Sequence, residues 1–366
     1  MIATATDESK PLPPLVTGFD IGGAHLKLAQ VDAHGRVLAA RQVACALWLG
    51  LDRLEQALNE ALAGMAPVAA TAITMTGELA DLFPDRATGV RRLTRAIADR
   101  FPHARHRLWA GEHGFLDLGA AVGAEAAIAS ANWLATASLV AREVGEGVLV
   151  DIGSTTTDIL VLGGGQVRAA GQTDRERLAS GELVYTGLAR TPLMAVASRA
   201  PFAGRWHGLM RELFATMADV HRVLNQLAES DDQHPAADNG PKTEEASLRR
   251  LARMLGADVE DGNVAAWRDL AAWFARGQLL AIEEAILLQL SRGLVGPTAP
   301  LVGAGCGRFL VERLASRLDR SYRDFADLVD APPEARQAAA VCAPAVAVAV
   351  LAAQEGAAEV GCALRG

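Results

Sequence analysis

The chain has 366 residues, a net charge of −8 and a pI near 5.6. This length allows two domains with substantial cores, and an acidic chain without a basic stripe is not expected to bind nucleic acid. The four cysteines form no C-x-x-C pair, which argues against a disulfide framework or a zinc site and favours a cytoplasmic location.

The two ends of the chain give separate predictions. Residues 1–14 are polar and contain several prolines, so we expect a disordered leader there rather than a signal peptide. Ala338–Ala353 is the most apolar run, but it is shorter than the ~20 residues that span a bilayer, and it contains Pro344. We therefore expect no membrane partner, and a buried C-terminal helix over residues 336–356 that packs back on the first domain.

The first elements in chain order form a hairpin. Val16–Val31 (VTGFDIGGAHLKLAQV) is an apolar run into Asp20, followed by a turn at Gly22 and Gly23 and a second apolar run with Lys27. A run without polar alternation is typical of a strand covered on both faces. The elements expected next are a strand over His34–Val43, a helix over Leu51–Met65, a strand over Ala69–Met75, a helix over Arg86–Phe101, a strand over Arg105–Ala110 and a long helix over Gly119–Val144.

The hairpin pattern occurs a second time. Val148–Leu162 (VLVDIGSTTTDILVL) is again an apolar run into an aspartate, a glycine turn and a second apolar run. Asp151 aligns with Asp20, and Asp158 stands where the first copy has Lys27. One Asp-x-Gly sequence is an ordinary strand-end turn, but two copies in register predict two similarly folded halves that face each other over one cleft.

The second turn has the composition of a phosphate-binding turn. Gly153 and the hydroxyls of Ser154, Thr155 and Thr156 put small side chains and free N–H groups where an anion can approach closely. Carboxylates beside a polyphosphate repel it unless a hard cation such as Mg²⁺ lies between them. The two hairpins therefore predict a metal–phosphate site.

The remainder of the second half is mostly helical. Residues 175–295 are expected to form a helical insertion with a polar break at Glu229–Ser247. The elements expected after it are a strand at Pro300–Val302, a turn with Gly303 and Gly305, and a helix at Arg308–Leu318.

The expected architecture is α/β, with one domain over residues 15–146 and a second over residues 147–335. Two such halves around a phosphate cleft, with a glycine-rich turn late in the second, resemble the actin, Hsc70 and sugar-kinase (ASKHA) superfamily. The resemblance implies two duplicated ribonuclease-H-like domains whose hairpins embrace nucleotide phosphates, and a late glycine turn that contacts adenosine. A fold alone does not fix a reaction.

Segments outside the hairpins resemble a narrower group, the hydantoinase/oxoprolinase-related proteins. Within it the similarity is greatest to the branch that assembles methanofuran-type cofactors in the tetrahydromethanopterin-linked one-carbon pathway. The segments that carry the resemblance are TMTGELADLF at Thr74–Phe83, NWLATASLVA at Asn132–Ala141, Gly171–Leu193, Glu212–Leu224 and Ala237–Asp258.

The resemblance implies an ether-forming condensation. In that reaction an aminomethylfuran-methanol diphosphate loses pyrophosphate, and the phenol of γ-glutamyltyramine captures the furfuryl carbon. For methylofuran, the phenol would instead belong to a tyrosine-derived unit. The implied partners are thus a small furan diphosphate and a phenolic amine, with Mg²⁺ as cofactor and ATP admitted but not required.

In this interpretation the hairpins bind the diphosphate and its metal ion. The metal ligands expected are Asp20, Asp151 and Asp158. The groups expected to bind diphosphate are Gly22, Gly23, Lys27, Gly153, Ser154, Thr155 and Thr156. A phenol with a pKa of ~10 needs a general base at neutral pH, for which Glu78 is the candidate and Asp20 the alternative. The catalytic residues expected are therefore Asp20, Glu78 and Asp151, although Glu78 would also suit a cap of its turn.

Five further residues are candidates for substrate binding. Tyr185 and Arg190 suit a ring and a carboxylate, or else core packing and a surface ion pair. Lys242 would close over diphosphate as a lid residue, or belong to a solvated loop. Gly303 and Gly305 would admit a flat ring, or only form a strand-to-helix turn.

Two other functions stay open. An ATP-dependent kinase or amide-activating enzyme of the hydantoinase/oxoprolinase type predicts ATP hydrolysis and tight adenosine binding. A non-catalytic nucleotide sensor or actin-like assembly protein predicts filaments or ligand-dependent partners. A homodimer is compatible with each of these functions.

Overall fold

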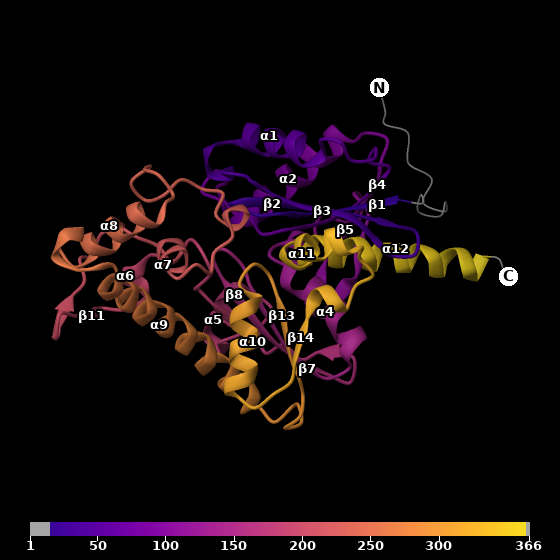
Figure 1. Cartoon of the computed structure of the whole chain (residues 1–366). Helices are drawn as coiled ribbons and strands as arrows, with labels where there is room; N and C mark the ends of the chain where they lie inside the picture. Colours follow the sequence, from indigo (N-terminus) through magenta and orange to yellow (C-terminus); the bar gives the residue numbers. More distant parts are fainter. Residues whose placement is uncertain (1–14, 364–366) are drawn as a thin grey trace. The chain divides into compact units, whose positions relative to one another are not determined.

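The chain folds into two compact units, shown in Figure 1. The computed structural model describes residues 15–363, with the side chains of residues 15–357. The leader expected over residues 1–14 lies outside the described residues.

Each unit is assembled from segments that are separate in the sequence. Unit 1 holds the described residues up to Gly145, together with Gly164–Val167 and the segment from Asp324 onward. Unit 2 holds Glu146–Gly163 and Arg168–Arg323. Residue 335, where we expected the second domain to end, thus falls inside the segment that returns to unit 1.

Unit 1 is built on a sheet with the strand order β3-β2-β1-β4-β5-β6. These strands are β1 (Leu15–Ile21), β2 (His25–Asp32), β3 (Val37–Ala44), β4 (Ala70–Met75), β5 (Arg105–Trp109) and β6 (Phe115–Leu116). The helices of the unit are α1 (Leu51–Leu62), α2 (Arg86–Arg100), α3 (Glu125–Ile128), α4 (Asn132–Val144), α11 (Pro333–Val341) and α12 (Ala343–Ala363). Short 3₁₀ turns are η1 (Leu47–Leu49), η2 (Gly77–Leu79), η3 (Gly111–His113) and η6 (Phe325–Asp327), and β9 (Gln166–Val167) also belongs here.

The long helix expected over Gly119–Val144 is wrong. The structure has two helices, α3 and α4, separated by residues 129–131. Ser130 lies in this break with φ of +50°, a left-handed backbone conformation that no helix interior allows. The alanine-rich composition favours helix throughout and therefore hides the break.

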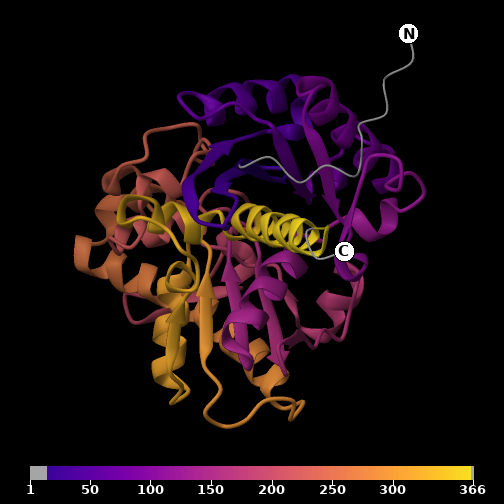
Figure 2. The same cartoon turned by 90° about the vertical axis from the view of Figure 1, so that its right-hand side faces the viewer.

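The C-terminal helix α12 covers one face of the unit 1 sheet, as Figure 2 shows. It packs on β1, β2 and β4, and also on α4. A Cβ atom on Gly18 of β1 would lie 2.0 Å from the Ala345 carbonyl oxygen. The glycine therefore lets the helix backbone rest directly on the strand.

The apolar run at the end of the chain forms two helices rather than one. α11 ends at Val341, and α12 begins at Ala343 with Pro344 in its first turn, a position that proline tolerates. No single helix of the described residues is long and apolar enough to cross a membrane, and α11 and α12 pass that test only as a pair bent by 107°.

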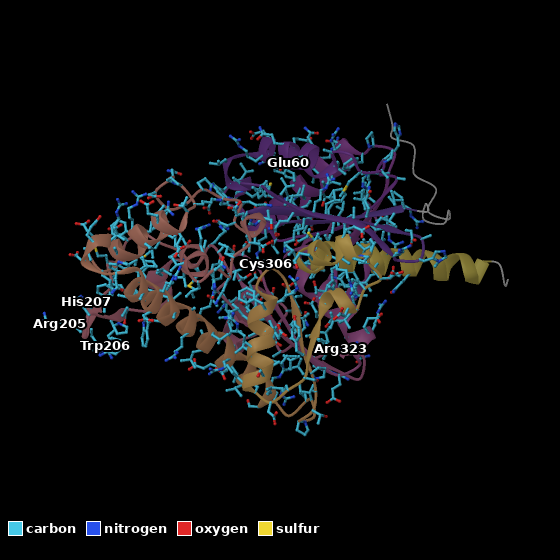
Figure 3. The ribbon with its side chains drawn as sticks, in the orientation of Figure 1. Glu60, Arg205, Trp206, His207, Cys306 and Arg323 are labelled. Atoms are coloured by element: carbon cyan, nitrogen blue, oxygen red, sulfur yellow. The ribbon has the colours of Figure 1, made fainter. Side chains whose placement is uncertain are left out.

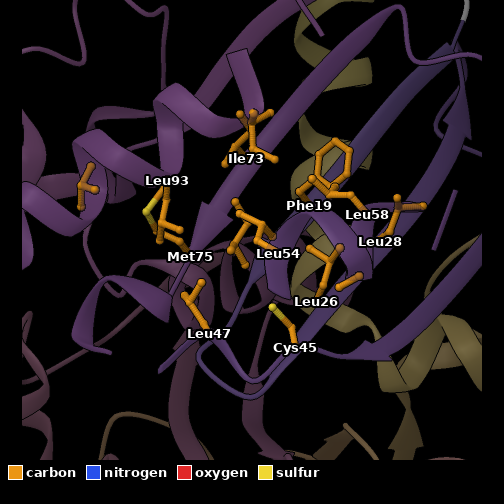
Figure 4. Close-up of a cluster of buried hydrophobic side chains, with 14 of the residues drawn as sticks. Phe19, Leu26, Leu28, Cys45, Leu47, Leu54, Leu58, Ile73, Met75 and Leu93 are labelled. Atoms are coloured by element: carbon orange, nitrogen blue, oxygen red, sulfur yellow. The ribbon is translucent and has the colours of Figure 1, made fainter. Parts of the chain in front are cut away.

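A core of buried side chains joins α1 and α2 to the sheet of unit 1 (Figure 4). Phe19, Leu26 and Leu28 come from the sheet, and Leu54 and Leu58 come from α1. All five are fully buried, and each such side chain contributes about 1.5–3 kcal/mol as an upper estimate.

Cys45, Cys306 and Cys342 are buried thiols, and none of them forms a disulfide within the described residues. Burial raises the pKa of Cys45 to about 11, so this thiol stays protonated. The side chain of the fourth cysteine, Cys362, lies outside the described residues.

Unit 2 is built on a sheet with the strand order β10-β8-β7-β13-β14. Its strands are β7 (Gly147–Ile152), β8 (Thr157–Gly163), β10 (Leu183–Val184), β13 (Leu301–Ala304) and β14 (Tyr322–Asp324), and the separate pair β11 (Arg199–Phe202) and β12 (Arg205–Gly208). Its helices are α5 (Asp174–Ser180), α6 (Leu193–Val196), α7 (Met217–Val223), α8 (Glu244–Met254), α9 (Val264–Leu290) and α10 (Arg308–Arg317), with 3₁₀ turns η4 (Glu229–Asp231) and η5 (Val259–Asp261).

The insertion is mostly helical, as predicted, but it also contains the hairpin β11–β12. This hairpin carries Arg205, Trp206 and His207, which Figure 3 shows side by side. Trp206 and His207 both lie on β12, and Trp206 stands edge-on to Trp273 of α9.

Ion pairs tie the polar break at Glu229–Ser247 to the helices of unit 2. Asp219 on α7 accepts hydrogen bonds from the Ser247 hydroxyl at 2.8 Å and from Arg250 at 3.0 Å. Arg250 also donates to Asp238 at 2.9 Å. Asp219 and Arg250 are both almost fully buried. A buried charge is tolerated only when it is paired in this way, so these contacts fix the course of the break.

The two sheets repeat one topology. β1 pairs antiparallel with β2 and parallel with β4, and β7 pairs antiparallel with β8 and parallel with β13. Asp20 stands opposite Lys27 in the first hairpin, and Asp151 stands opposite Asp158 in the second. The duplication predicted from the two Asp-x-Gly runs is therefore confirmed in the backbone.

Candidate functional site

In unit 1 the predicted residues gather at the carboxyl end of β1. The Gly22 N–H donates to the His25 carbonyl oxygen at 2.9 Å and closes the β1–β2 turn. Asp20 is almost fully buried, and its Oδ2 lies 3.8 Å from Nζ of Lys27. The hairpin thus places one carboxylate beside one ammonium group, while Gly23 has open space where a Cβ would be.

Glu78 follows β4 at the same end of the sheet. It is 1% exposed, and its Oε1 accepts a hydrogen bond of 2.7 Å from the Ser130 hydroxyl. A Cβ on Gly89 of α2 would lie 2.6 Å from the Glu78 carbonyl oxygen, so the helix packs directly on this residue. The left-handed conformation of Ser130 aims its hydroxyl at a buried carboxylate, and such strained conformations gather at functional sites.

In unit 2 the predicted phosphate turn, Gly153–Thr156, joins β7 to β8. The Gly153 N–H donates to the Thr156 carbonyl oxygen at 2.9 Å, the same closing bond as in the first hairpin. The side chains of Ser154, Thr155 and Thr156 are partly exposed. The Ser154 and Thr155 hydroxyl oxygens lie 3.5 Å apart. The turn therefore presents several hydroxyl groups within one small region.

A strap formed by Thr186–Thr191 lies against this turn. The Leu188 N–H donates to the Gly153 carbonyl oxygen at 2.9 Å, and the Arg190 N–H donates to the Ser154 carbonyl oxygen at 2.8 Å. A Cβ on Gly187 would lie 2.4 Å from the Thr155 nitrogen, so only glycine allows this approach. The strap thus engages carbonyl oxygens that would repel an anion.

A buried polar chain holds the strap in place. Gln278 of α9 donates to the Thr186 hydroxyl at 3.0 Å and to the Gly187 carbonyl oxygen at 2.7 Å. Its Oε1 lies 2.9 Å from Nε2 of His221, which is fully buried on α7. Burial lowers the pKa of His221, while its contacts with Gln278 and Gln226 oppose the shift. The neutral imidazole can then donate to Gln278 and fix the orientation of its amide.

Asp158 has a partner that the sequence did not predict. The buried Arg177 of α5 donates to Asp158 Oδ1 at 2.5 Å. A capping box of Thr173 and Glu176 begins α5, and Gly181, with φ of +75°, ends it. These local signals set the direction of Arg177, and the ion pair neutralises the charge of Asp158.

The carboxylates at the two turns fit Mg²⁺ if water and substrate phosphates supply the remaining ligands. Among the described residues, no group of three or more His, Cys, Asp or Glu is placed to hold a metal ion. Mg²⁺ is usually bound by one or two carboxylates, by waters and by substrate phosphates. Asp20 and Asp151 each end a buried strand beside a turn, and either fits that arrangement. Asp158 fits it less well, because Arg177 already engages Oδ1.

The structure brings Arg190 to the phosphate turn, with Tyr185 near its guanidinium. Tyr185 is 68% exposed, so it is not a core residue. Arg190 donates to the Thr155 hydroxyl at 3.2 Å. Burial lowers the pKa of its guanidinium, and the nearby Tyr185 opposes the shift. The positive charge of Arg190 therefore lies beside the turn.

Lys242 and the two late glycines have partners within unit 2. Lys242 donates to the Asp232 carbonyl oxygen, and its Nζ lies 3.7 Å from the Asp232 carboxylate. A Cβ on Gly303 would lie 2.8 Å from the Tyr322 ring. A Cβ on Gly305, which has φ of +79°, would lie 2.5 Å from Asp151 Oδ1. The glycine turn thus packs closely on the end of β7.

Three of these functional contacts were missed from the sequence. Ser130, Arg177 and Gln278 lie far along the chain from the groups they contact or stand in unremarkable helical sequence. The capping box at Thr173 was a readable signal for α5, but nothing local indicates that Arg177 would face Asp158. Gln278 reaches the strap across 92 residues of sequence.

The chain belongs to the hydantoinase/oxoprolinase family, whose sequence pattern matches residues 69–355. The predicted membership is thereby confirmed. The chain also has the predicted ASKHA fold: it superposes with a TM-score of 0.53 on a nucleotide-free structure of an acetone carboxylase, described as catalysing ATP-dependent acetone carboxylation. The identity to that protein is 12%, with 90% of this chain and 70% of that chain covered.

Two relatives are more specific. The chain is 33% identical over 247 residues to the (4-{4-[2-(γ-L-glutamylamino)ethyl]phenoxymethyl}furan-2-yl)methanamine synthase of Methanocaldococcus jannaschii, which covers 67% of this chain and 73% of that protein. It is 37% identical over 112 residues to the protein of the same name from Methanococcus vannielii, with 31% of this chain and half of that protein covered. Both relatives are named as synthases of the same compound.

Proposed function

We propose that this chain is a transferase of methanofuran-type cofactor biosynthesis. It would join an aminomethylfuran-methanol diphosphate to the phenol of γ-glutamyltyramine, or of a tyrosine-derived unit, and release pyrophosphate. The observation that carries the proposal is the β7–β8 turn, in which the hydroxyls of residues 154–156 and the Arg190 guanidinium lie together. The relatives named as synthases of the corresponding ether support the choice of reaction.

The reaction breaks the bond between the furfuryl carbon and the diphosphate oxygen, and the electron pair leaves with the diphosphate. A lone pair of the phenol oxygen forms the new C–O bond, and the phenolic proton passes to a base. Negative charge therefore grows on the diphosphate as the bond breaks. Preorganised donors at that position supply what is usually the largest catalytic effect.

In this proposal the phosphate turn and Arg190 bind the diphosphate in unit 2. The strap engages the Gly153 and Ser154 carbonyl oxygens, which keeps these acceptors from repelling an anion. Arg190 adds a charged donor, and hydrogen bonds to charged donors are about twice as strong as neutral ones.

Mg²⁺ would be held by Asp20 or Asp151 together with the diphosphate, and it would neutralise charge on the leaving group. We assign Asp158 to the ion pair with Arg177 rather than to the metal. ATP is not needed for this reaction, because the diphosphate substrate already carries the leaving group.

The phenol must lose its proton to react at neutral pH. We keep Glu78 as the candidate base, because a hydrogen bond from Ser130 fixes its carboxylate. Asp20, beside Lys27, is the alternative. Glu78→Gln and Asp20→Asn separate these candidates. Only the variant that removes the base should abolish the acidic limb of the pH–rate profile at saturating Mg²⁺.

The deciding experiment measures pyrophosphate release from the furan diphosphate with γ-glutamyltyramine and Mg²⁺, without ATP, with the mass of the product determined. Release that requires the phenol and yields the ether supports the proposal. No release until ATP is added would overturn it in favour of an ATP-dependent kinase or amide-activating enzyme.

A further inference from the structure

Two loops of unit 2 lie against each other at one edge of its sheet. β7 and β13 are parallel, so their carboxyl ends share this edge. β7 runs into the phosphate turn, and β13 runs into the glycine turn of residues 303–307, which leads to α10. The Gly307 N–H donates to the Ile152 carbonyl oxygen at 2.9 Å, and a Cβ on Gly305 would lie 2.5 Å from Asp151 Oδ1. In open α/β sheets, ligands bind outside the carboxyl ends of the strands.

The 3₁₀ turn η4 lies near the same loops. Arg308, the first residue of α10, donates from Nη1 to the Gly305 carbonyl oxygen at 3.3 Å. The charge of Arg308 also acts on Asp231 of η4. Asp232, the next residue, pairs with Arg222 of α7 and fixes the course of the chain. η4 is therefore held in place near the start of α10.

Asp231 is a buried carboxylate that the protein leaves without a hydrogen bond. It is 6% exposed. Within residues 15–357, neither a hydrogen bond nor an ion pair reaches its side chain, and the charge of Arg308 acts only from a distance. Glu182, Asp219 and Glu283 are also buried in unit 2, but each accepts a hydrogen bond from an arginine side chain. Burial raises the pKa of the Asp231 carboxyl, and Arg308 opposes the shift.

A buried carboxylate is costly unless a partner compensates for its lost hydration, so Asp231 is suited to a cationic group that a ligand brings. We propose that Asp231 binds the protonated aminomethyl group of the furan diphosphate. This rests on the proposed function, in which the furan substrate carries a primary amine. Such an amine is protonated at neutral pH, as lysine is. The compound for which the two relatives are named is likewise a methanamine.

The two ends of this substrate have opposite charges, and so do the two places in unit 2 that would receive them. Arg190 and the hydroxyls of the phosphate turn suit the diphosphate, and Asp231 suits the ammonium group. The reversed orientation would put the ammonium group beside Arg190 and the diphosphate beside a carboxylate. Asp231 would thus select the aminomethylated furan and fix the direction of its ring.

The test compares wild type, Asp231→Asn, Asp231→Ser and the control Glu229→Gln. Glu229 is exposed in the same turn η4, so the control removes an equal charge that faces solvent. Each protein is titrated calorimetrically with the furan diphosphate and with its analogue that has methyl in place of aminomethyl. Mg²⁺ is present and the phenol is omitted, so that no ether forms. Mg²⁺-pyrophosphate and Mg²⁺-ATP are the two further ligands.

We expect wild type to bind the amine ligand at least about tenfold more tightly than the methyl analogue, because a hydrogen bond between charged groups is worth one to two orders of magnitude in affinity. Asp231→Asn should reduce this preference to less than threefold and leave the Kd of the methyl analogue within twofold. Glu229→Gln should behave as wild type. A merely structural role of Asp231 would weaken both furan ligands and pyrophosphate equally.

Equal affinity of wild type for the two furan ligands would overturn the proposal, as would an unchanged preference in Asp231→Asn. So would a loss of ATP affinity alone in that variant, because the carboxylate would then serve a nucleotide. If Asp231→Asn fails to fold, Asp231→Ser takes its place with the same expectation. An amine preference that depends on Asp231, without ether formation once the phenol is added, would disprove the proposed function and keep the amine site. Normal ether formation with no amine preference would do the reverse.

Discussion

The β1–β2 turn of unit 1 and the β7–β8 turn of unit 2 occupy equivalent places in their sheets, and each is closed by a 2.9 Å hydrogen bond from its glycine, Gly22 or Gly153. In each, two carbonyl oxygens of the turn accept N–H groups from a segment that packs beside it. In unit 1 those N–H groups belong to Cys45 and Leu47, and in unit 2 the strap supplies them.

The side chains at the two turns differ. In unit 1, Lys27 on the neighbouring strand lies near Asp20. In unit 2 the equivalent position is Asp158, and α5 brings Arg177 to neutralise it. The second turn carries hydroxyls and lies beside Arg190, whereas the first turn consists of Gly22, Gly23 and Ala24. A duplicated backbone can thus retain one geometry while its two copies carry different side chains, and in our proposal the copy in unit 2 binds the anion.

The largest effect should come from the carboxylates that end the two central strands. Asp151→Asn should lower kcat for pyrophosphate release at least ~100-fold, because the charge that helps to hold Mg²⁺ is lost. Asp20→Asn tests the equivalent position. A Mg²⁺ titration of both variants shows which unit holds the metal, since that variant alone should need more Mg²⁺ for half-maximal rate.

The control for this prediction is Asp99→Asn, which changes an exposed carboxylate on α2 that pairs with the exposed Arg95. It should leave both kcat and the Mg²⁺ requirement unchanged. A loss smaller than threefold in both Asp20→Asn and Asp151→Asn would remove these residues from the mechanism.

The ion pair between Arg177 and Asp158 should contribute strongly to the stability of unit 2. Arg177→Met leaves Asp158 without its buried partner and should lower the free energy of unfolding by about 3 kcal/mol. The double variant Arg177→Met with Asp158→Asn should recover most of that loss. Lys27→Met should cost less, because its Nζ is 3.8 Å from Asp20. Urea unfolding of these three variants and of the single variant Asp158→Asn measures this, and additive losses in the double variant would show that the pair is not coupled.

The strap should connect stability to anion binding. Gln278→Leu removes both hydrogen bonds to residues 186 and 187 and leaves buried polar groups unsatisfied, at a cost of about 2 kcal/mol. It should also weaken Mg²⁺-pyrophosphate binding, because the turn loses its support. Gln226→Leu, which removes the longer 3.3 Å contact to His221, is the matched control. Equal pyrophosphate affinity of Gln278→Leu and wild type would show that the strap does not position the turn.

The buried histidines should make stability depend on pH. Burial lowers the pKa of His221 in unit 2 and of His106 in unit 1. The unfolded chain takes up a proton near pH 6.5 while the folded imidazole stays neutral, so stability is present above that pH and is lost as the pH falls below it.

The expected loss is at most about 1.4 kcal/mol per pH unit for each such histidine. Urea unfolding of wild type, His221→Gln and His106→Gln between pH 7.5 and roughly 5 measures it. His221→Gln should flatten the pH dependence more than His106→Gln, because His221 is the more deeply buried. A free energy of unfolding that is constant over this range would contradict the prediction.

The sequence was sufficient to predict the backbone of both hairpins, because both contain the same local pattern. An apolar run that ends in Asp-x-Gly combines a buried strand with a tight turn, and both signals are local. The same local signals failed at Ser130, where an alanine-rich run contains a left-handed residue that breaks the helix.

The candidate site was predictable only in part. Its carboxylates, glycines and hydroxyls lie within the hairpins, and the structure places them at the strand ends as expected. The groups that set their charge and orientation arrive from distant elements: Arg177 from α5, Gln278 from α9 and Ser130 from the break before α4. Such contacts depend on tertiary packing, which periodicity does not encode.

The smallest effect should come from Lys242, for which the sequence left a lid and a loop as alternatives. In the structure its Nζ is bound to Asp232, whose carboxylate also pairs with Arg222. Lys242→Ala should therefore lower the free energy of unfolding by less than about 1 kcal/mol, as for a partly exposed pair. It should leave KM for the furan diphosphate unchanged. Arg53→Ala, which removes an exposed cation on α1, is the control. A KM that rises several-fold in Lys242→Ala alone would restore the lid and show that unit 2 changes conformation when the diphosphate binds.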